Sequence, residues 1–251
     1  CLRGPFVFIS LPRGYRSVGP FYARTAPGEV IDFPLTEWAE SSGDRARFVQ
    51  ITDIHMGFPS DDVPRFKDDL AELDAMEPKV SFALVTGDVV HIGKDATQYD
   101  SYREGIDTLN LPHFDFPGNH DVENTEGLNH YHNTLGPDYY SFNFAHCHFV
   151  LINGFPYAYQ SETYLAEFLD TGRRPTEEEL PGGITQLEWI ERDLAVAPPG
   201  STIIFGAHFL PSPTMLRLFH SFGAKAVLSG HCHGNRVREE TDVLDLNSPP
   251  F

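Results

Sequence analysis

Five short segments of this 251-residue chain carry strong metal ligands directly after an apolar run. In chain order they are Asp53-Ile54-His55, Gly87-Asp88, Gly118-Asn119-His120-Asp121, Gly206-Ala207-His208 and Gly230-His231-Cys232-His233. Buried strands have this apolar character, and open α/β sheets gather their functional groups where such strands end. The pattern therefore predicts an α/β fold with all five segments at one edge of its sheets.

Strand and helix patterns alternate along the chain after residue 46. Apolar runs typical of strands are found at 48–52, 81–86, 114–116, 202–205 and 226–229. Helical spacing is found at about 62–76, 95–109 and 185–194, and residues 139–144 and 148–152 alternate like an antiparallel pair. The polar, Glu-rich stretch 157–180 predicts a loop or lid. In it, Arg173 and Arg174 are either solvated or in reach of a substrate phosphate.

The first 45 residues differ from the rest, because short strand candidates at 6–10 and 29–33 are separated by turn signals. We expect residues 1–45 to form an N-terminal β arm, or the remnant of a small β module. Residues 46–251 would form the main domain. No run of about 18 apolar residues is present, so no membrane span is expected. The formal charge of −18 argues against a nonspecific nucleic-acid binder.

The five segments offer two carboxylates, one amide oxygen and four imidazoles as candidate ligands. Seven ligands exceed what a single zinc ion needs, but they suit two metal ions that share one bridging carboxylate. His120 is left over and could act as an acid, with Asp121 available to orient it. His91 follows Asp88 closely and is either packed or in contact with substrate or a ligand carboxylate. The pattern indicates a hydrolase that generates its own hydroxide.

The order D-x-H, GD, GNHD, GxH, GHxH resembles that of the calcineurin-like metallophosphoesterase superfamily, over about residues 47–251. The resemblance implies a four-layer αββα sandwich, with two mixed β-sheets flanked by helices and a short N-terminal β segment. It also implies two metal ions drawn from Mn, Fe and Zn. Asp53, His55, Asp88 and His233 would hold the first ion. Asp88, Asn119, His208 and His231 would hold the second, with Asp88 as the bridge and His120 assisting the leaving group.

One difference from the superfamily's protein Ser/Thr phosphatases narrows the choice of branch. Their second motif is followed by Asp-Arg-Gly, whereas Gly87-Asp88 is followed here by Val89-Val90-His91. The resemblance then implies a phosphodiesterase or phosphatase of the bacterial type, acting on a small phosphate ester by attack of a metal-bridging hydroxide, with diesters preferred. A nuclease and a catalytically silent binding protein on the same fold are the alternatives. The N-terminal segment is similar to a small β module of some bacterial members, which slightly favours an extracytoplasmic location.

Overall fold

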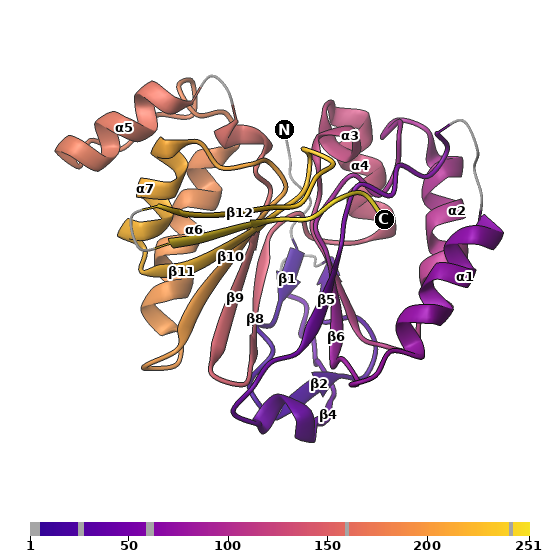
Figure 1. Cartoon of the computed structure of the whole chain (residues 1–251). Coiled ribbons are helices and arrows are strands. Elements are labelled where there is room, and N and C mark those ends of the chain that lie inside the picture. The colour runs from indigo at the N-terminus through magenta and orange to yellow at the C-terminus, as the bar shows by residue number, and fades with distance from the viewer. Residues whose placement is uncertain (1–5, 25–27, 59–62, 159–160, 241–242) are drawn as a thin grey trace.

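Two β-sheets pack face to face at the centre of the molecule, with helices on both outer faces (Figure 1). The computed structural model describes residues 6–24, 28–58, 63–158, 161–240 and 243–251. The smaller sheet has three parallel strands, which are β5 (Phe48–Ile51), β6 (Phe82–Val85) and β7 (His113–Asp115). The sequence predicted two sheets of mixed parallel and antiparallel strands. The described strands of this smaller sheet all run parallel, and the mixed arrangement is found in the larger sheet.

The larger sheet has six strands in the order β12-β13-β11-β10-β9-β8. In chain order these are β8 (Tyr140–Phe144), β9 (Cys147–Ile152), β10 (Thr202–Ala207), β11 (Ala224–Ser229), β12 (Arg236–Glu240) and β13 (Val243–Asn247). β9, β10, β11 and β13 run parallel, whereas β8 and β12 pair antiparallel at the two edges. The predicted antiparallel pair of β8 and β9 is therefore confirmed.

Helices cover both sheets and complete the four-layer αββα sandwich that the sequence predicted. The smaller sheet is covered by α1 (Val63–Asp74), α2 (Ala96–Ile106) and α4 (Thr125–Thr134). The larger sheet is covered by α6 (Gly183–Val196) and α7 (Pro213–Ser221), and α5 (Glu162–Thr171) packs on α7. Three short helices are η1 (Ala39–Ser42), η2 (Phe155–Tyr157) and α3 (Asn119–Val122). No helix among the described residues is long and apolar enough to cross a membrane.

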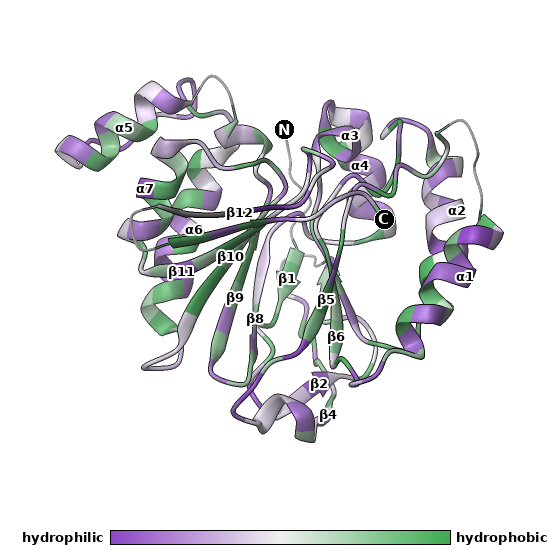
Figure 2. Ribbon diagram, viewed as in Figure 1, coloured by the Kyte–Doolittle hydropathy of each residue, from purple (hydrophilic) through white to green (hydrophobic). Residues whose placement is uncertain are grey.

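Strand alternation explains the layers. Phe82 of β6 and Phe149 of β9 face the space between the sheets, where a third ring, Phe142, stacks on Phe149 at 4.7 Å. Their neighbours Ala83 and Val150 point outward and pack under the helices. Both sheets are thus buried on two faces, which is why their central strands are hydrophobic along their length (Figure 2).

The N-terminal segment forms two small antiparallel strand pairs beside the main sheets. β1 (Phe6–Phe8) pairs with β3 (Tyr22–Arg24), and β2 (Tyr15–Ser17) pairs with β4 (Leu35–Glu37). The strand expected at 29–33 lies instead at Leu35–Glu37. Leu11 and Trp38 are buried in the core between the sheets, so this segment packs on the main domain. Its division from the main domain at residue 45 stays a prediction.

The stretch expected to be a loop or lid contains helix α5, and ion pairs hold it in place. Arg173 contacts Glu167 at 2.7 Å and Glu179 at 3.0 Å, while Arg174 contacts Glu191 of α6 at 2.6 Å. Both arginines are therefore engaged by carboxylates of the same region, which leaves the substrate-gripping alternative without support.

Candidate metal centre

All five ligand-bearing loops leave the carboxyl ends of strands at one edge of the two sheets. They follow β5, β6, β7, β10 and β11. Among the described residues, six that are not glycine have a positive φ, and five of these are predicted ligands: Asp53 (53°), His55 (50°), Asp88 (54°), His231 (70°) and His233 (48°). Each such conformation costs about 1–3 kcal/mol and is typical of functional sites, where the surroundings enforce it. Backbone strain is therefore concentrated on the predicted ligands.

One group of side chains joins Asp53, His55 and His233. His55 Nε2 lies 3.3 Å from His233 Nε2, and His233 Nε2 lies 3.2 Å from Asp53 Oδ1. Two nitrogens bound to one tetrahedral cation through bonds of about 2.0–2.1 Å would be about 3.3 Å apart. The spacing of these atoms therefore fits a shared cation.

A second group joins Asp88, His208 and His231, each offering a ligand atom within 4.8 Å of the others. His208 is fully buried, and its Nδ1 donates to the Thr86 carbonyl at 2.7 Å. In the neutral ring that bond leaves the lone pair on Nε2, which lies 3.1 Å from Asp88 Oδ2 and has no hydrogen-bond partner among the described residues. A lone pair facing a carboxylate oxygen needs a proton or a cation between them, so this group also fits a metal ion.

The two groups adjoin each other through their carboxylates. His55 Nε2 of the first lies 3.8 Å from Asp88 Oδ2 of the second, and His208 Nε2 lies 4.0 Å from Asp53 Oδ1. Asn119 Oδ1 is buried and has no hydrogen-bond partner among the described residues. A buried oxygen without a donor is costly, and a cation would satisfy it. Carboxylate, amide and imidazole donors together suit Mn, Fe and Zn.

The protonation states match a cation site. Burial lowers the pKa of His55 to about 4, against a smaller raising effect of Asp88. Burial, and then the charge of His208, lowers the pKa of His231. Burial would raise the pKa of Asp88, but the close contact with His208 and the charge of that ring outweigh it and keep this pKa below its ordinary value. His55 and His231 therefore offer lone pairs at neutral pH, and Asp88 offers a negative charge. Burial lowers the pKa of His208, but the contact with Asp88 and its charge outweigh burial and raise it, so a proton on His208 Nε2 takes the place that a cation would hold.

Glycines allow the loops to approach each other closely. A Cβ on Gly118 would collide with the carboxylate and backbone nitrogen of Asp88. A Cβ on Gly230 would collide with the Thr52 hydroxyl and the Asp53 carboxylate. Only glycine therefore fits at these two positions beside the predicted ligands.

The Asp121 carboxylate binds backbone N–H groups and not the ring of His120, which it was expected to orient. Its carboxylate is fully buried and accepts four backbone N–H groups, from Asp88 (2.8 Å), Val89 (3.4 Å), Val90 (3.1 Å) and Gly118 (2.8 Å). Burial, and then the charge of Asp88, raises the pKa of Asp121 to about 8. Successive residues on a helix point in different directions, which is why the Asp121 side chain turns back to cap α3 and not toward its neighbour. Asp121 is a positioning residue that holds two ligand loops together.

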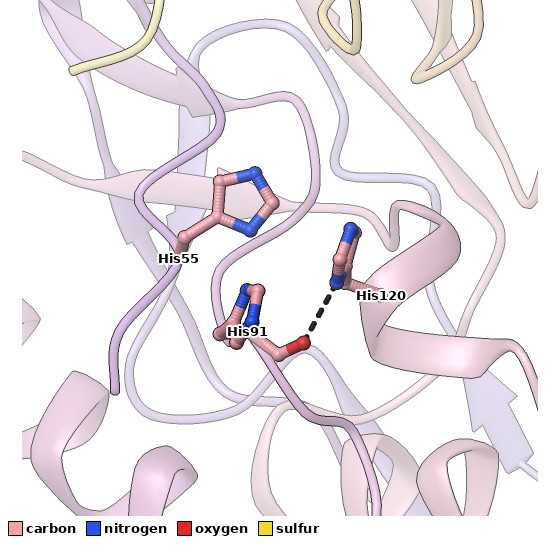
Figure 3. Close-up of side chains that lie close together, drawn as sticks. All are labelled: His55, His91 and His120. Atoms are coloured by element: carbon pink, nitrogen blue, oxygen red, sulfur yellow. Dashed lines mark hydrogen bonds between the residues drawn. The ribbon is translucent and has the colours of Figure 1, made fainter. Parts of the chain in front are cut away.

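His120 is oriented by a backbone carbonyl instead (Figure 3). Its Nδ1 donates to His91 O at 2.7 Å, and its backbone N–H donates to Asp88 Oδ1 at 2.9 Å. The ring of His91 stacks on that of His120 with centroids 5.2 Å apart, and His55 lies edge-on to His120 at 4.6 Å. Nε2 is thus the His120 nitrogen available to exchange a proton.

Three cavities adjoin these side chains. The central cavity, of 230 Å³, is lined by five histidines together with Asp88 and Phe58. The Phe58 cavity, of 280 Å³, shares His55, His233 and Phe58 with it and is bounded by α1. The Phe209 cavity, of 330 Å³, shares His231 with the central cavity and lies on the side of α5 and α7. One outer cavity is bounded by α1 and the other by α5 and α7, and these helices lie on opposite sides of the two sheets (Figure 1). The two outer cavities therefore lie on different sides of the central one.

Sequence reasoning missed several residues that support the ligands. The Thr52 hydroxyl donates to Asp53 Oδ2 at 2.7 Å, and Asn247 donates its side-chain N–H to the Gly230 carbonyl. Gln50 bridges the sheets by donating to Ser229 O at 2.7 Å. Thr52 stands next to a ligand and could have been suspected. Asn247 and Gln50 belong to no motif, and only the packing of the two sheets brings them to the site.

Comparison with known proteins gives one family and a shared fold. Residues 46–235 match the family described as calcineurin-like phosphoesterase. A search of curated proteins finds no match. Among solved structures, the purple acid phosphatase PPD1 from yellow lupin (Lupinus luteus) seeds is similar with a TM-score of 0.57 and 14% identity, over 80% of this chain. The matched part is 43% of the lupin chain, so this chain spans less than half of that protein.

Two further structures resemble the chain at comparable levels. TT1561 of Thermus thermophilus has a TM-score of 0.53 and 12% identity, over 82% of this chain and 90% of that chain. GAP50, described as the anchor in the inner membrane complex of Plasmodium, has a TM-score of 0.52 and 15% identity, over 81% of this chain and 71% of that chain. At such identities these likenesses concern the fold alone. The family match over residues 46–235 covers most of the chain and includes all five loops, and the chain therefore belongs to the calcineurin-like phosphoesterase family.

Proposed function

We propose that this protein hydrolyses phosphate esters, with diesters preferred, at a centre of two metal ions. The observation that carries the proposal is the pair of adjoining donor groups, Asp53–His55–His233 and Asp88–His208–His231, which lie at one edge of the sheets. Asn119 would complete the second group with its unpartnered buried oxygen. Two such ions would polarise a phosphoryl oxygen and lower the pKa of a water molecule.

In this proposal the chain's own residues supply orientation and a proton. Hydrolysis joins the oxygen of water to phosphorus, breaks the bond from phosphorus to the leaving oxygen, and requires a proton on that oxygen. We assign the proton to His120 Nε2, since Nδ1 is committed to the His91 carbonyl. Asp121 keeps Asp88 and Gly118 in register through its backbone hydrogen bonds, so that the ligands from two loops converge.

The cavities support the preference for diesters. A phosphate monoester carries one organic group, whereas a diester carries two. The Phe58 cavity and the Phe209 cavity adjoin the central cavity on different sides, so each could accept one group of a diester whose phosphorus lies between them.

Two alternatives stand beside this proposal. A nuclease is disfavoured by the formal charge of −18, because nucleic-acid backbones are held by basic surfaces. A catalytically silent protein is the second alternative, because GAP50, which shares the fold, is described as an anchor.

The test combines metal analysis with turnover of bis-p-nitrophenyl phosphate and p-nitrophenyl phosphate. Wild type is compared with Asp88→Asn and with the control Asp100→Asn, which changes an exposed aspartate of α2. We expect about two metal ions per chain, and turnover of the diester that Asp88→Asn abolishes and Asp100→Asn retains. Turnover of the monoester alone would make the protein a phosphatase. Bound metal with no turnover of either ester would favour the silent protein, and failure to bind Mn, Fe or Zn would refute the centre.

A further inference from the structure

The Phe58 cavity is lined by three phenylalanine rings, whereas the central cavity is lined by one. Its inner wall is formed by His55 and His233, the predicted ligands of one ion, and its sides by Phe58, Phe66 and Phe251. The rings of Phe66 and Phe251 meet edge to face with centroids 6.0 Å apart. Any group bound in this cavity would therefore touch both aromatic surface and the metal centre.

Phe58 is the apolar residue that the two cavities share. It lines both of them, and its ring lies 4.7 Å from that of His91. It is 57% exposed although it is a large apolar side chain at the edge of a polar site. Covering such a ring is favourable by about 25 cal/mol per Å² of apolar surface removed from water. A planar group stacked on Phe58 would gain that burial while staying attached to a phosphoryl group in the central cavity.

The outer rim of the Phe58 cavity is polar and carries both signs of charge. Arg65 Nε lies 3.8 Å from Asp69 Oδ2, and both residues line the cavity from helix α1. Together they offer hydrogen-bond donors and acceptors to the edge of a ring whose face lies on Phe58. A heteroaromatic ring with donors and acceptors on its edge matches this combination better than an alkyl chain does.

We propose that the Phe58 cavity binds one organic group of the diester substrate, and that this group carries a nucleobase or a similar heteroaromatic ring stacked on Phe58. This inference rests on the proposed function and names the substrate class of the same site. Phe58 then determines specificity without taking part in the bond-breaking step.

The test uses two diesters with the same leaving group. Thymidine 5′-(p-nitrophenyl phosphate) and methyl p-nitrophenyl phosphate both release p-nitrophenolate, and they differ in whether the remaining group carries a base. Base–aromatic stacking is lost on substitution by alanine, so kcat/KM for the thymidine ester should fall roughly 5- to 150-fold in Phe58→Ala. The methyl ester should lose much less than the thymidine ester, and Phe58→Tyr should restore the thymidine ester.

Controls keep the outcomes separate. Tyr15→Ala removes another exposed aromatic ring, from β2, and should leave both substrates unaffected. Equal losses of kcat/KM for the two esters in Phe58→Ala would show that Phe58 acts on the metal centre through His91. That result would leave the proposed function standing and overturn this inference. An unchanged kcat/KM for the thymidine ester would overturn it too. If the metal-loaded wild type hydrolysed neither ester, the proposed function would fall, and the inference with it.

Discussion

Replacing Gly118 by alanine perturbs a close approach between two ligand loops. The new Cβ would collide with the Asp88 carboxylate and backbone nitrogen, and neither can yield freely. The nitrogen donates to Asp121 at 2.8 Å, and Asp88 Oδ1 accepts from His120 N–H at 2.9 Å. Overpacking of a buried site costs about 1–3 kcal/mol, and a hydrogen bond to a charged group contributes about 1.5–3 kcal/mol. If one such bond breaks, Gly118→Ala loses about 2.5–6 kcal/mol of unfolding free energy.

A loss of that size is a large fraction of the roughly 5–15 kcal/mol that stabilises a domain. Urea denaturation followed by circular dichroism, in the presence of a chelator, would measure it, and metal content and diester turnover would be measured in parallel. The control is Gly43→Ala, whose Cβ would come no closer than 3.4 Å to Glu40 O, so its stability should change by less than about 0.5 kcal/mol. A Gly118→Ala protein with the stability and metal content of wild type would refute the close approach on which the site's geometry depends.

Three further outcomes are expected. His120→Asn should retain two metal ions while kcat falls roughly 10²- to 10⁴-fold, more for alkoxide than for p-nitrophenolate leaving groups; equal losses for both would argue against proton donation. A chelator should lower the melting temperature of wild type but not of Asp88→Asn, as followed by calorimetry, because bound ions stabilise only the folded state. The pKa of His113 is raised, since burial lowers it but the adjacent Asp115 charge outweighs burial. The stabilisation of the fold by the His113–Asp115 ion pair is therefore present at acidic pH and is lost as pH rises through the folded-state pKa of His113. In urea titrations, His113→Gln should lower the free energy of unfolding more at pH 5 than at pH 8. An equal loss at both pH values would contradict the ion pair.

The sequence specifies the positions of the strands well, because each buried strand ends at a residue with a distinct chemical character. β5 stops before Asp53 and β6 before Asp88, as the apolar runs indicate. Helix α5 was missed, although Leu165 and Leu169 have helical spacing and pack toward the core of the larger sheet. The many glutamates in that region suggested a solvated loop, but two of them, Glu167 and Glu179, form ion pairs with Arg173. Composition alone could not distinguish a polar loop from an amphipathic helix.

The convergence of the motif residues could be predicted from the sequence, but their contacts could not. The motif residues meet because parallel strands share an edge, which a sequence pattern can indicate. The role of Asp121 depends on the direction of its side chain at the start of α3, and the motif does not encode that direction. The support from Asn247 depends on β13 entering the larger sheet next to β11, a pairing that only the whole fold determines. Phe58 could not be singled out in advance because its exposure is a property of the folded surface.

The spread of the donor groups along the chain has a consequence for assembly. His55 leaves the smaller sheet and His233 follows β11 of the larger one, 178 residues later, yet their ring nitrogens are neighbours. Neither sheet alone supplies both His55 and His233. An ion that binds both rings could therefore gain all its ligands only after the two halves have docked. Metal uptake would then follow docking, and bound ions would cross-link two halves that already meet through the phenylalanine rings between the sheets and the Gln50–Ser229 hydrogen bond.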